Sequence, residues 1–196
     1  MNYWNKLKTK LGITKNLATL GFSDLLGNGI TSILWLYLAS IMDSSVYGEL
    51  HFMISIAASA NLVSLFVTPT VVTVYVSKNL KLESTLYLIS LLIGLISSIV
   101  IILVFSRIDV GLLVFAFIIN DLSIAYLVGK KQYTSYAKYF LIQKIFAASL
   151  CILLYFLIGT TGIIYGLFIS YLPFAIIIYK GFKDTKINFS ELKSKK

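Results

Sequence analysis

Cysteine, histidine, proline and acidic residues are all scarce in this chain. Its 196 residues include one cysteine, one histidine and two prolines. A single cysteine excludes an intrachain disulfide. With one cysteine and one histidine, the chain cannot build a metal site that needs several residues of either type. The sequence has no phosphate-binding glycine loop, nucleophile elbow or His-Glu metal motif, and its few acids are dispersed. These absences predict that the chain is not an enzyme and holds no cofactor or metal ion.

Charge is also sparse relative to apolar content. Charged residues make up 13% of the chain and hydrophobic residues 58%, and the mean hydropathy is +0.89. A soluble domain of this size has too much surface for so few charges. The net charge of +9 would suggest nucleic acid in a soluble protein. Here the lysines lie between apolar runs, where they are typical of membrane topology and of contacts with anionic lipid.

Apolar runs of membrane-spanning length are abundant. A helix needs roughly 20 apolar residues to cross a bilayer core, and six stretches approach that length: 17–41, 47–77, 83–105, 109–129, 139–158 and 162–179. We predict an all-α, polytopic transmembrane helix bundle. The second stretch could tilt, or break at Thr68-Pro69-Thr70, and Pro173 could kink the sixth. The predicted parts are a cytoplasmic interfacial segment (1–16), the transmembrane domain (17–180) and a cytoplasmic tail or connector (181–196).

The distribution of cations predicts the orientation. Sixteen of the 17 cations fall before the first stretch, after the sixth, in the second and fourth loops or near the start of the fifth stretch. The other three loops contain only Arg107, alongside Asp43 and Asp109. Since cytoplasmic loops carry an excess of lysine and arginine, both termini are expected on the cytoplasmic side of the cell membrane.

The residues before the first stretch form an amphipathic pattern. Trp4, Leu7 and Leu11 share one helical face, with lysines between them. This pattern predicts a short interfacial helix on the inner leaflet, and a protein-binding role is the alternative.

Polar side chains within the stretches are the candidate site residues, because burying them in a membrane costs free energy. We assign the substrate or ion pathway to the residues Asp24, Asn28, Asn61, Asn120, Asp121 and Lys144. In the first stretch, Asp24 and Asn28 share a helical face with Thr31 and Trp35. In the second, a small and polar stripe follows the same spacing: Ala57, Asn61, Ser64 and Thr68. His51, near the outer face, and Cys151 are interpreted as packing residues.

The predicted orientation places three ionisable candidates in the inner half of the membrane. Asp24 lies seven residues inside its stretch, Asp121 about eight and Lys144 about five. Two interpretations stay open. Asp121 and Lys144 could form a buried ion pair across the hairpin of the fourth and fifth stretches. Alternatively, the polar residues could line a cavity open to the cytoplasm, in which Asp24 binds a proton or a sodium ion.

The first two stretches carry a family resemblance. The relevant features are a basic N-terminus, a first span with small and polar residues (17–41), a short outer loop with Tyr47-Gly48 and a long second helix ending at Ser77-Lys78. This arrangement resembles the oligosaccharide flippases of the multidrug, oligosaccharidyl-lipid and polysaccharide exporter superfamily. The resemblance implies one six-helix lobe of a transporter that has two such lobes, with residues 187–193 similar to the connector before a seventh helix.

The resemblance also implies a function. The chain would move lipid-linked oligosaccharide or polysaccharide precursors across the membrane by alternating access, with a second six-helix lobe or another copy of itself as partner. Asp24 looks like the ion-binding carboxylate in the first helix of the drug-exporting branch, so a proton- or sodium-coupled exporter is the alternative. A non-transporting membrane partner protein is a further one. A lipid-linked glycan and the bilayer are the expected partners, and nucleic acid is not.

Overall fold

The computed structural model describes residues 3–65, 69–78, 80, 82–185 and 187, and the side chains of these apart from 3–15, 17 and 184. The described ranges are helical and contain no strand. Six helical segments are long and apolar enough to cross a membrane: 18–41, 44–64, 83–105, 108–129, 133–158 and 160–183. The predicted all-α, polytopic membrane bundle is therefore confirmed.

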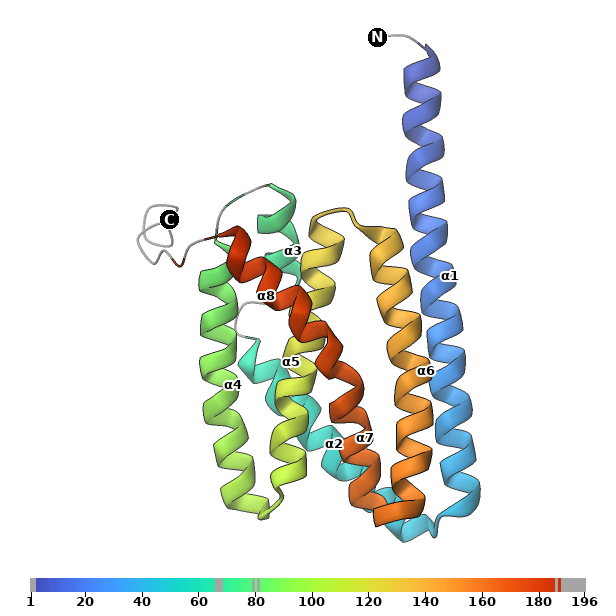
Figure 1. Ribbon diagram of the computed structural model, residues 1–196, viewed down its shortest axis with the longest axis vertical. Coiled ribbons are helices and arrows are strands. Elements are labelled where there is room, and N and C mark those ends of the chain that lie inside the picture. The colour runs from blue at the N-terminus through green and yellow to red at the C-terminus, as the bar shows by residue number, and fades with distance from the viewer. Residues whose placement is uncertain (1–2, 66–68, 79, 81, 186, 188–196) are drawn as a thin grey trace.

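The first helix is the longest element. Helix α1 (Tyr3–Ile41) runs without interruption, and its N-terminal part projects beyond the other helices (Figure 1). Residues 3–16 thus extend the first span rather than forming a separate short helix, since no proline interrupts the sequence there. The membrane-surface location of Trp4, Leu7 and Leu11 stays a prediction, because their side chains lie outside the described part.

Both prolines interrupt helices, as predicted. Helix α2 (Ser44–Ser64) ends before the first proline, and Pro69 begins α3 (Pro69–Ser77). Proline suits a first helical turn because its missing N–H would have no partner there. In the sixth span, α7 (Thr160–Tyr171) passes through a short 3-10 turn, η1 (Leu172–Phe174), into α8 (Ala175–Asp184). The turn contains Pro173.

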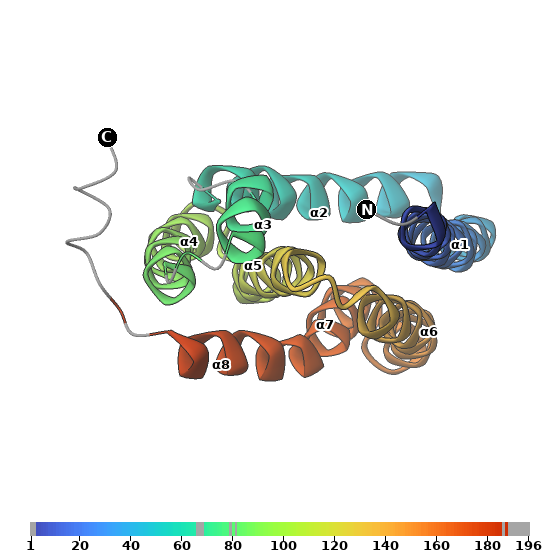
Figure 2. The same cartoon turned by 90° about the horizontal axis from the view of Figure 1, so that it is seen from above.

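The remaining spans are single helices arranged around a central one. They are α4 (Glu83–Phe105), α5 (Ile108–Gly129) and α6 (Tyr133–Ile158). Helix α5 contacts α2, α3, α4, α6, α7 and α8. Seen from above, α2 and α3 lie on one side of it and α7 and α8 on the other, while α1 packs mainly against α6 at the edge of the bundle (Figure 2).

Helices α6 and α7 approach each other closely at two glycines. A Cβ atom added to Gly166 would lie 2.8 Å from the backbone nitrogen of Cys151, and one added to Gly162 would collide with the carbonyl of Leu154. Two glycines four residues apart are a common way for membrane helices to bring their backbones together. Cys151 is buried in this contact and its thiol donates to the carbonyl of Ile163, consistent with the predicted packing role.

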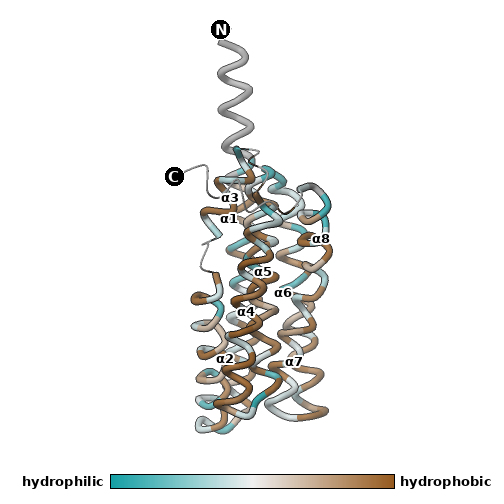
Figure 3. The backbone as a smooth tube through the Cα atoms, turned by 90° about the vertical axis from the view of Figure 1, so that its left-hand side faces the viewer, coloured by the Kyte–Doolittle hydropathy of each residue, from teal (hydrophilic) through white to brown (hydrophobic). Residues whose placement is uncertain are grey.

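The two ends of the bundle differ in charge. The start of α1 and the end of α8 lie at the same end of the bundle as the loops that carry Lys78, Lys130 and Lys131 (Figure 1). We call this the lysine-rich end; between the two ends the backbone is mostly hydrophobic (Figure 3). At the opposite end, Arg107 donates two hydrogen bonds to Asp109, at 2.9 and 2.8 Å, and lies 4.0 Å from Glu49. The hydrogen bonds with Asp109 raise the pKa of Arg107 above its usual range. This cation is therefore neutralised by carboxylates on both sides.

At the lysine-rich end, polar contacts attach α4 to its neighbours. The hydroxyl of Ser84 lies 2.6 Å from the carbonyl oxygen of Thr185 and 2.6 Å from its hydroxyl, and the backbone nitrogen of Ser84 donates to that hydroxyl at 3.1 Å. Glu83, in the first turn of α4 as a carboxylate near a helix N-terminus should be, lies 3.9 Å from Lys130. These contacts join the start of α4 to the end of α8 and to the α5–α6 loop.

Candidate functional site

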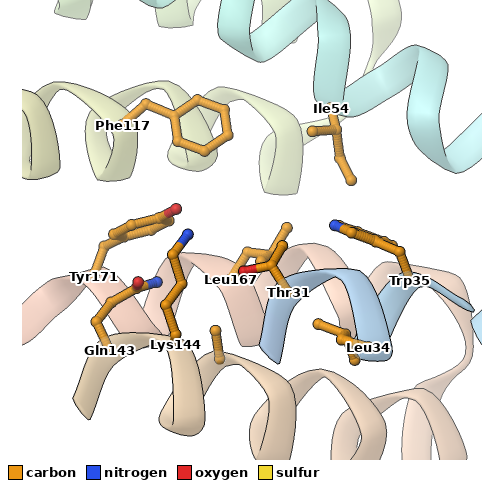
Figure 4. A pocket seen from close by; sticks show the side chains of 10 residues that line it. Thr31, Leu34, Trp35, Ile54, Phe117, Gln143, Lys144, Leu167 and Tyr171 are labelled. Atoms are coloured by element: carbon orange, nitrogen blue, oxygen red, sulfur yellow. The ribbon is translucent and has the colours of Figure 1, made fainter. Parts of the chain in front are cut away.

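A cavity of about 160 Å³ lies among α1, α2, α5, α6 and α7. Its lining comprises Thr31, Leu34, Trp35, Ile54, Phe117, Gln143, Lys144, Ala147, Leu167 and Tyr171. Most of these side chains are apolar, and the polar atoms among them belong to hydroxyl, amide, indole and ammonium groups (Figure 4). The cavity therefore combines an apolar wall with several hydrogen-bond donors, and no lining residue is an acid.

Lys144 supplies the cation of this cavity. Its amine points into the space between Tyr171 and Thr31 (Figure 4), and its Nζ lies 5.2 Å from the ring centroid of Phe140. Among the described residues, Lys144 is in no ion pair. Because α6 starts at Tyr133 rather than at the predicted residue 139, Lys144 lies 11 residues from one end and 14 from the other. It is near the middle of its span, deeper than predicted.

A short chain of hydrogen bonds adjoins the cavity on α6 and α7. The amide of Gln143 donates to the hydroxyl of Ser170 at 3.1 Å, which in turn donates to the carbonyl of Leu167 at 2.7 Å. The sequence singled out neither Ser170 nor Tyr171, since serine and tyrosine are ordinary residues of membrane helices and carry no spacing signal.

Asp121 is held by two amides instead of a cation. Its carboxylate accepts from Asn61 of α2 at 2.8 Å and from Asn120 at 3.0 Å. The predicted ion pair between Asp121 and Lys144 is absent from the described contacts, and this prediction is therefore wrong. The two amides satisfy the carboxylate of Asp121, and Lys144, on α6, does not contact it. Asp121 lies one helical turn along α5 from Phe117, which lines the cavity. The cluster of Asn61, Asn120 and Asp121 therefore lies one turn beyond the cavity on α5.

Asp24 and Asn28 lie apart from this cavity. The Asp24 carboxylate accepts a 2.6 Å hydrogen bond from the hydroxyl of Tyr136, which joins α1 to α6. Asn28 is exposed and does not line the cavity. The predicted polar face of α1 is therefore divided: Thr31 and Trp35 reach the cavity, whereas Asp24 contacts α6 and Asn28 faces outward. Sequence spacing could not show this, because it does not say where the neighbouring helix lies.

The other predicted polar stripe faces the bundle interior. Ala57, Asn61 and Ser64 are buried along α2, and the Ser64 hydroxyl donates to that of Ser97 at 3.1 Å. Thr68 lies outside the described residues. His51 packs between aromatic rings, with centroid distances of 4.6 Å to Trp35 and 4.5 Å to Tyr47. Within the described ranges, no three His, Cys, Asp or Glu side chains gather where a metal ion could bind.

No family model, curated protein or solved structure matches this chain. The apolar helices show a multi-pass membrane protein. The flippase resemblance stays a prediction from the first two spans.

Proposed function

We propose that this chain is a transport protein of the cytoplasmic membrane, and specifically one lobe of a flippase for lipid-linked oligosaccharide or polysaccharide precursors. The observation that carries the proposal is the position of Lys144, an ammonium group without an acidic partner among the described residues, in a mid-span cavity lined by donors. An unpaired charge at this depth costs free energy, so intramembrane cations commonly mark substrate pathways. A phosphate attached to a lipid-linked sugar would neutralise it.

The size of the cavity bears on how much of the substrate one lobe would bind. At about 160 Å³, it has room for a small charged group and its water but not for an oligosaccharide. We therefore assign the phosphate to this cavity and the glycan to a larger space shared with a second lobe or a second copy of this chain. In this proposal both termini are cytoplasmic, because the lysine-rich end of the bundle faces the cytoplasm.

Reconstituted vesicles test the proposal. The protein, reconstituted at high protein-to-lipid ratio so that lobes can pair, would be given a fluorescent polyprenyl-diphosphate oligosaccharide, and transfer between leaflets followed by quenching from outside. Lys144→Gln should slow transfer about tenfold, the loss of one charge-assisted hydrogen bond. Lys138→Gln is the matched control, since Lys138 lies on the same helix but is exposed and outside the cavity. Equal rates for the two variants, or no protein-dependent transfer, would contradict the proposal.

The hydrogen bond between Tyr136 and Asp24 favours a second candidate, an ion-coupled exporter. A carboxylate inside a span that accepts a hydrogen bond at 2.6 Å is the kind of group that binds a coupling proton or sodium ion. Export of a small molecule would then depend on an ion gradient and should be lost in Asp24→Asn. Gradient-dependent export that persists in this variant would rule out the coupling role.

A further inference from the structure

A second cavity, of about 180 Å³, lies near the lysine-rich end of the bundle. Its lining comprises Tyr126 and Leu127 of α5, Gln132 of the α5–α6 loop, Ser135 and Tyr139 of α6, and Ile177 and Lys180 of α8. It shares no residue with the cavity around Lys144. The two cavities are therefore separate sites, and the transport proposal makes no use of this one.

Its polar lining is a set of donors around one cation. Lys180 is exposed and, among the described residues, belongs to no ion pair. The carboxylate of Glu83, in the first turn of α4, lies 3.9 Å from a different lysine, Lys130. No lining residue is acidic. A ligand at this position would meet positive charge without competition from a carboxylate of the lining.

Two hydroxyl groups in the lining have no hydrogen-bond partner among the described residues. Several helical serines here donate to a carbonyl one turn earlier, as Ser55, Ser59 and Ser149 do, but Ser135 makes no such bond. Tyr139 makes a ring contact with Phe174, at 5.9 Å between centroids, and its hydroxyl forms no described bond. Both groups are free to donate to a ligand.

The lining also includes apolar side chains. Leu127 and Ile177 are buried lining residues, while Ile176 and Tyr179 on α8 are exposed beside them. A site that combines a cation and hydroxyl donors with apolar side chains suits a ligand with an anionic group attached to hydrocarbon. Basic pockets between helices near the cytoplasmic surface of a membrane are typical binding places for anionic lipid headgroups.

We propose that this cavity binds the phosphate-bearing headgroup of an anionic phospholipid, with Lys180 as the counter-ion and Ser135 and Tyr139 as donors. The uncapped start of α6, where Gln132 makes no side-chain cap bond, adds partial positive charge beside the phosphate. The inference does not rest on the transport proposal, because binding of a resident lipid is measured without any transported substrate.

The full-length protein in detergent tests the site by native mass spectrometry with added dioleoylphosphatidylglycerol. Lys180→Gln should reduce lipid occupancy about fivefold, the effect of losing one lysine near a lipid headgroup. Lys183→Gln is the matched control, since Lys183 is also exposed on α8 but is not in the lining, and it should change occupancy less than about twofold. The double variant Ser135→Ala/Tyr139→Phe, which keeps every charge, should also lower occupancy. Lys144→Gln should leave it unchanged.

Two further additions distinguish a phospholipid headgroup from free phosphate as the ligand. Phosphatidylcholine should bind more weakly than phosphatidylglycerol, and inorganic phosphate at millimolar concentration should not displace the lipid. Equal loss in the Lys180→Gln and Lys183→Gln variants would show diffuse attraction instead of a site and would overturn the proposal. Displacement of the lipid by inorganic phosphate would show that the site binds a free anion instead of a lipid. Equal binding of phosphatidylglycerol and phosphatidylcholine would show that the charge of the headgroup has no role.

Discussion

At the scale of single residues, the two carboxylates Asp24 and Asp121 each accept a hydrogen bond from a residue far away in sequence. Asp121 is held by Asn61, 60 positions earlier, and Asp24 by Tyr136, 112 positions later. The sequence identified most of these groups because polar residues in apolar runs stand out. It could not pair them, since pairing depends on which helices are adjacent. The predicted pair of Asp121 with Lys144 was wrong for this reason.

The bond between Tyr136 and Asp24 should contribute to stability. Removing it by Tyr136→Phe leaves a carboxylate inside the protein without its donor, which typically costs about 1–3 kcal/mol. Reversible unfolding in mixed micelles should show this loss, whereas Tyr37→Phe, on an exposed part of α1, should change the free energy of unfolding by less than about 0.5 kcal/mol. Similar values for both variants would mean that the hydrogen bond adds nothing to the α1–α6 contact.

The glycines of α7 give a prediction with a clear steric cause. In Gly166→Ala the new methyl group would lie 2.8 Å from a backbone nitrogen and 2.9 Å from the Cα atom of Cys151. Backbone cannot move aside as a flexible side chain can, so we expect a loss of about 1–3 kcal/mol in unfolding free energy. Gly29→Ala is the control: nothing lies within 4 Å of its added methyl group, and alanine favours the helix. A stable Gly166→Ala variant would show that α6 and α7 are not in close contact.

At the scale of elements, the positions of the two prolines predicted the helix interruptions most directly. The predicted break near Thr68-Pro69-Thr70 separates α2 from α3, and Pro173 lies in the turn between α7 and α8. The start of α6 was placed six residues too late, because residues 133–138 (YTSYAK) are polar enough to be mistaken for a loop. Helix continues there because Tyr136 packs against α1 and hydrogen-bonds Asp24, a contact that the local sequence does not reveal.

The attachment of α8 to α4 is a property of the elements that can be tested. Thr185→Val removes the hydroxyl that accepts from the Ser84 backbone nitrogen, while keeping the side-chain shape. We expect amide hydrogen exchange in α8 and in the first turn of α4 to become faster, with exchange in α5 unchanged. Ser149→Ala serves as the control because the Ser149 hydroxyl bonds only to its own helix. Unchanged exchange in α8 would mean that apolar packing alone holds this helix.

At the scale of the whole molecule, six spans and a central α5 place the start of α1 and the end of α8 at one end of the bundle. The all-α bundle was predictable because hydrocarbon demands long apolar helices, a requirement that shows in composition. Which spans are neighbours was not predictable. Helix α1 packs on α6 instead of α2, and no periodic pattern in the sequence indicates this choice.

The proposed orientation can be measured by labelling with a membrane-impermeant maleimide in intact cells. In a Cys151→Ala background, Ser45→Cys at the low-charge end should react from outside. Ser77→Cys at the lysine-rich end should react only after the cells are opened, because lysine-rich segments stay inside. The background protein without cysteine is the control for non-specific signal. Labelling of Ser77→Cys in intact cells would reverse the orientation and move the proposed lipid site to the other leaflet.

The contact of Arg107 with Asp109 has a consequence for how the protein enters the membrane. The two residues are separated by one position, so they can pair before any tertiary contact exists. In the proposed orientation their loop must cross the bilayer during synthesis. Moving one elementary charge across a potential of 100 mV involves about 2.3 kcal/mol, and an inside-negative cell opposes the outward passage of a cation. Paired with its neighbour, Arg107 is carried across as part of a neutral unit on which the membrane potential does no net work.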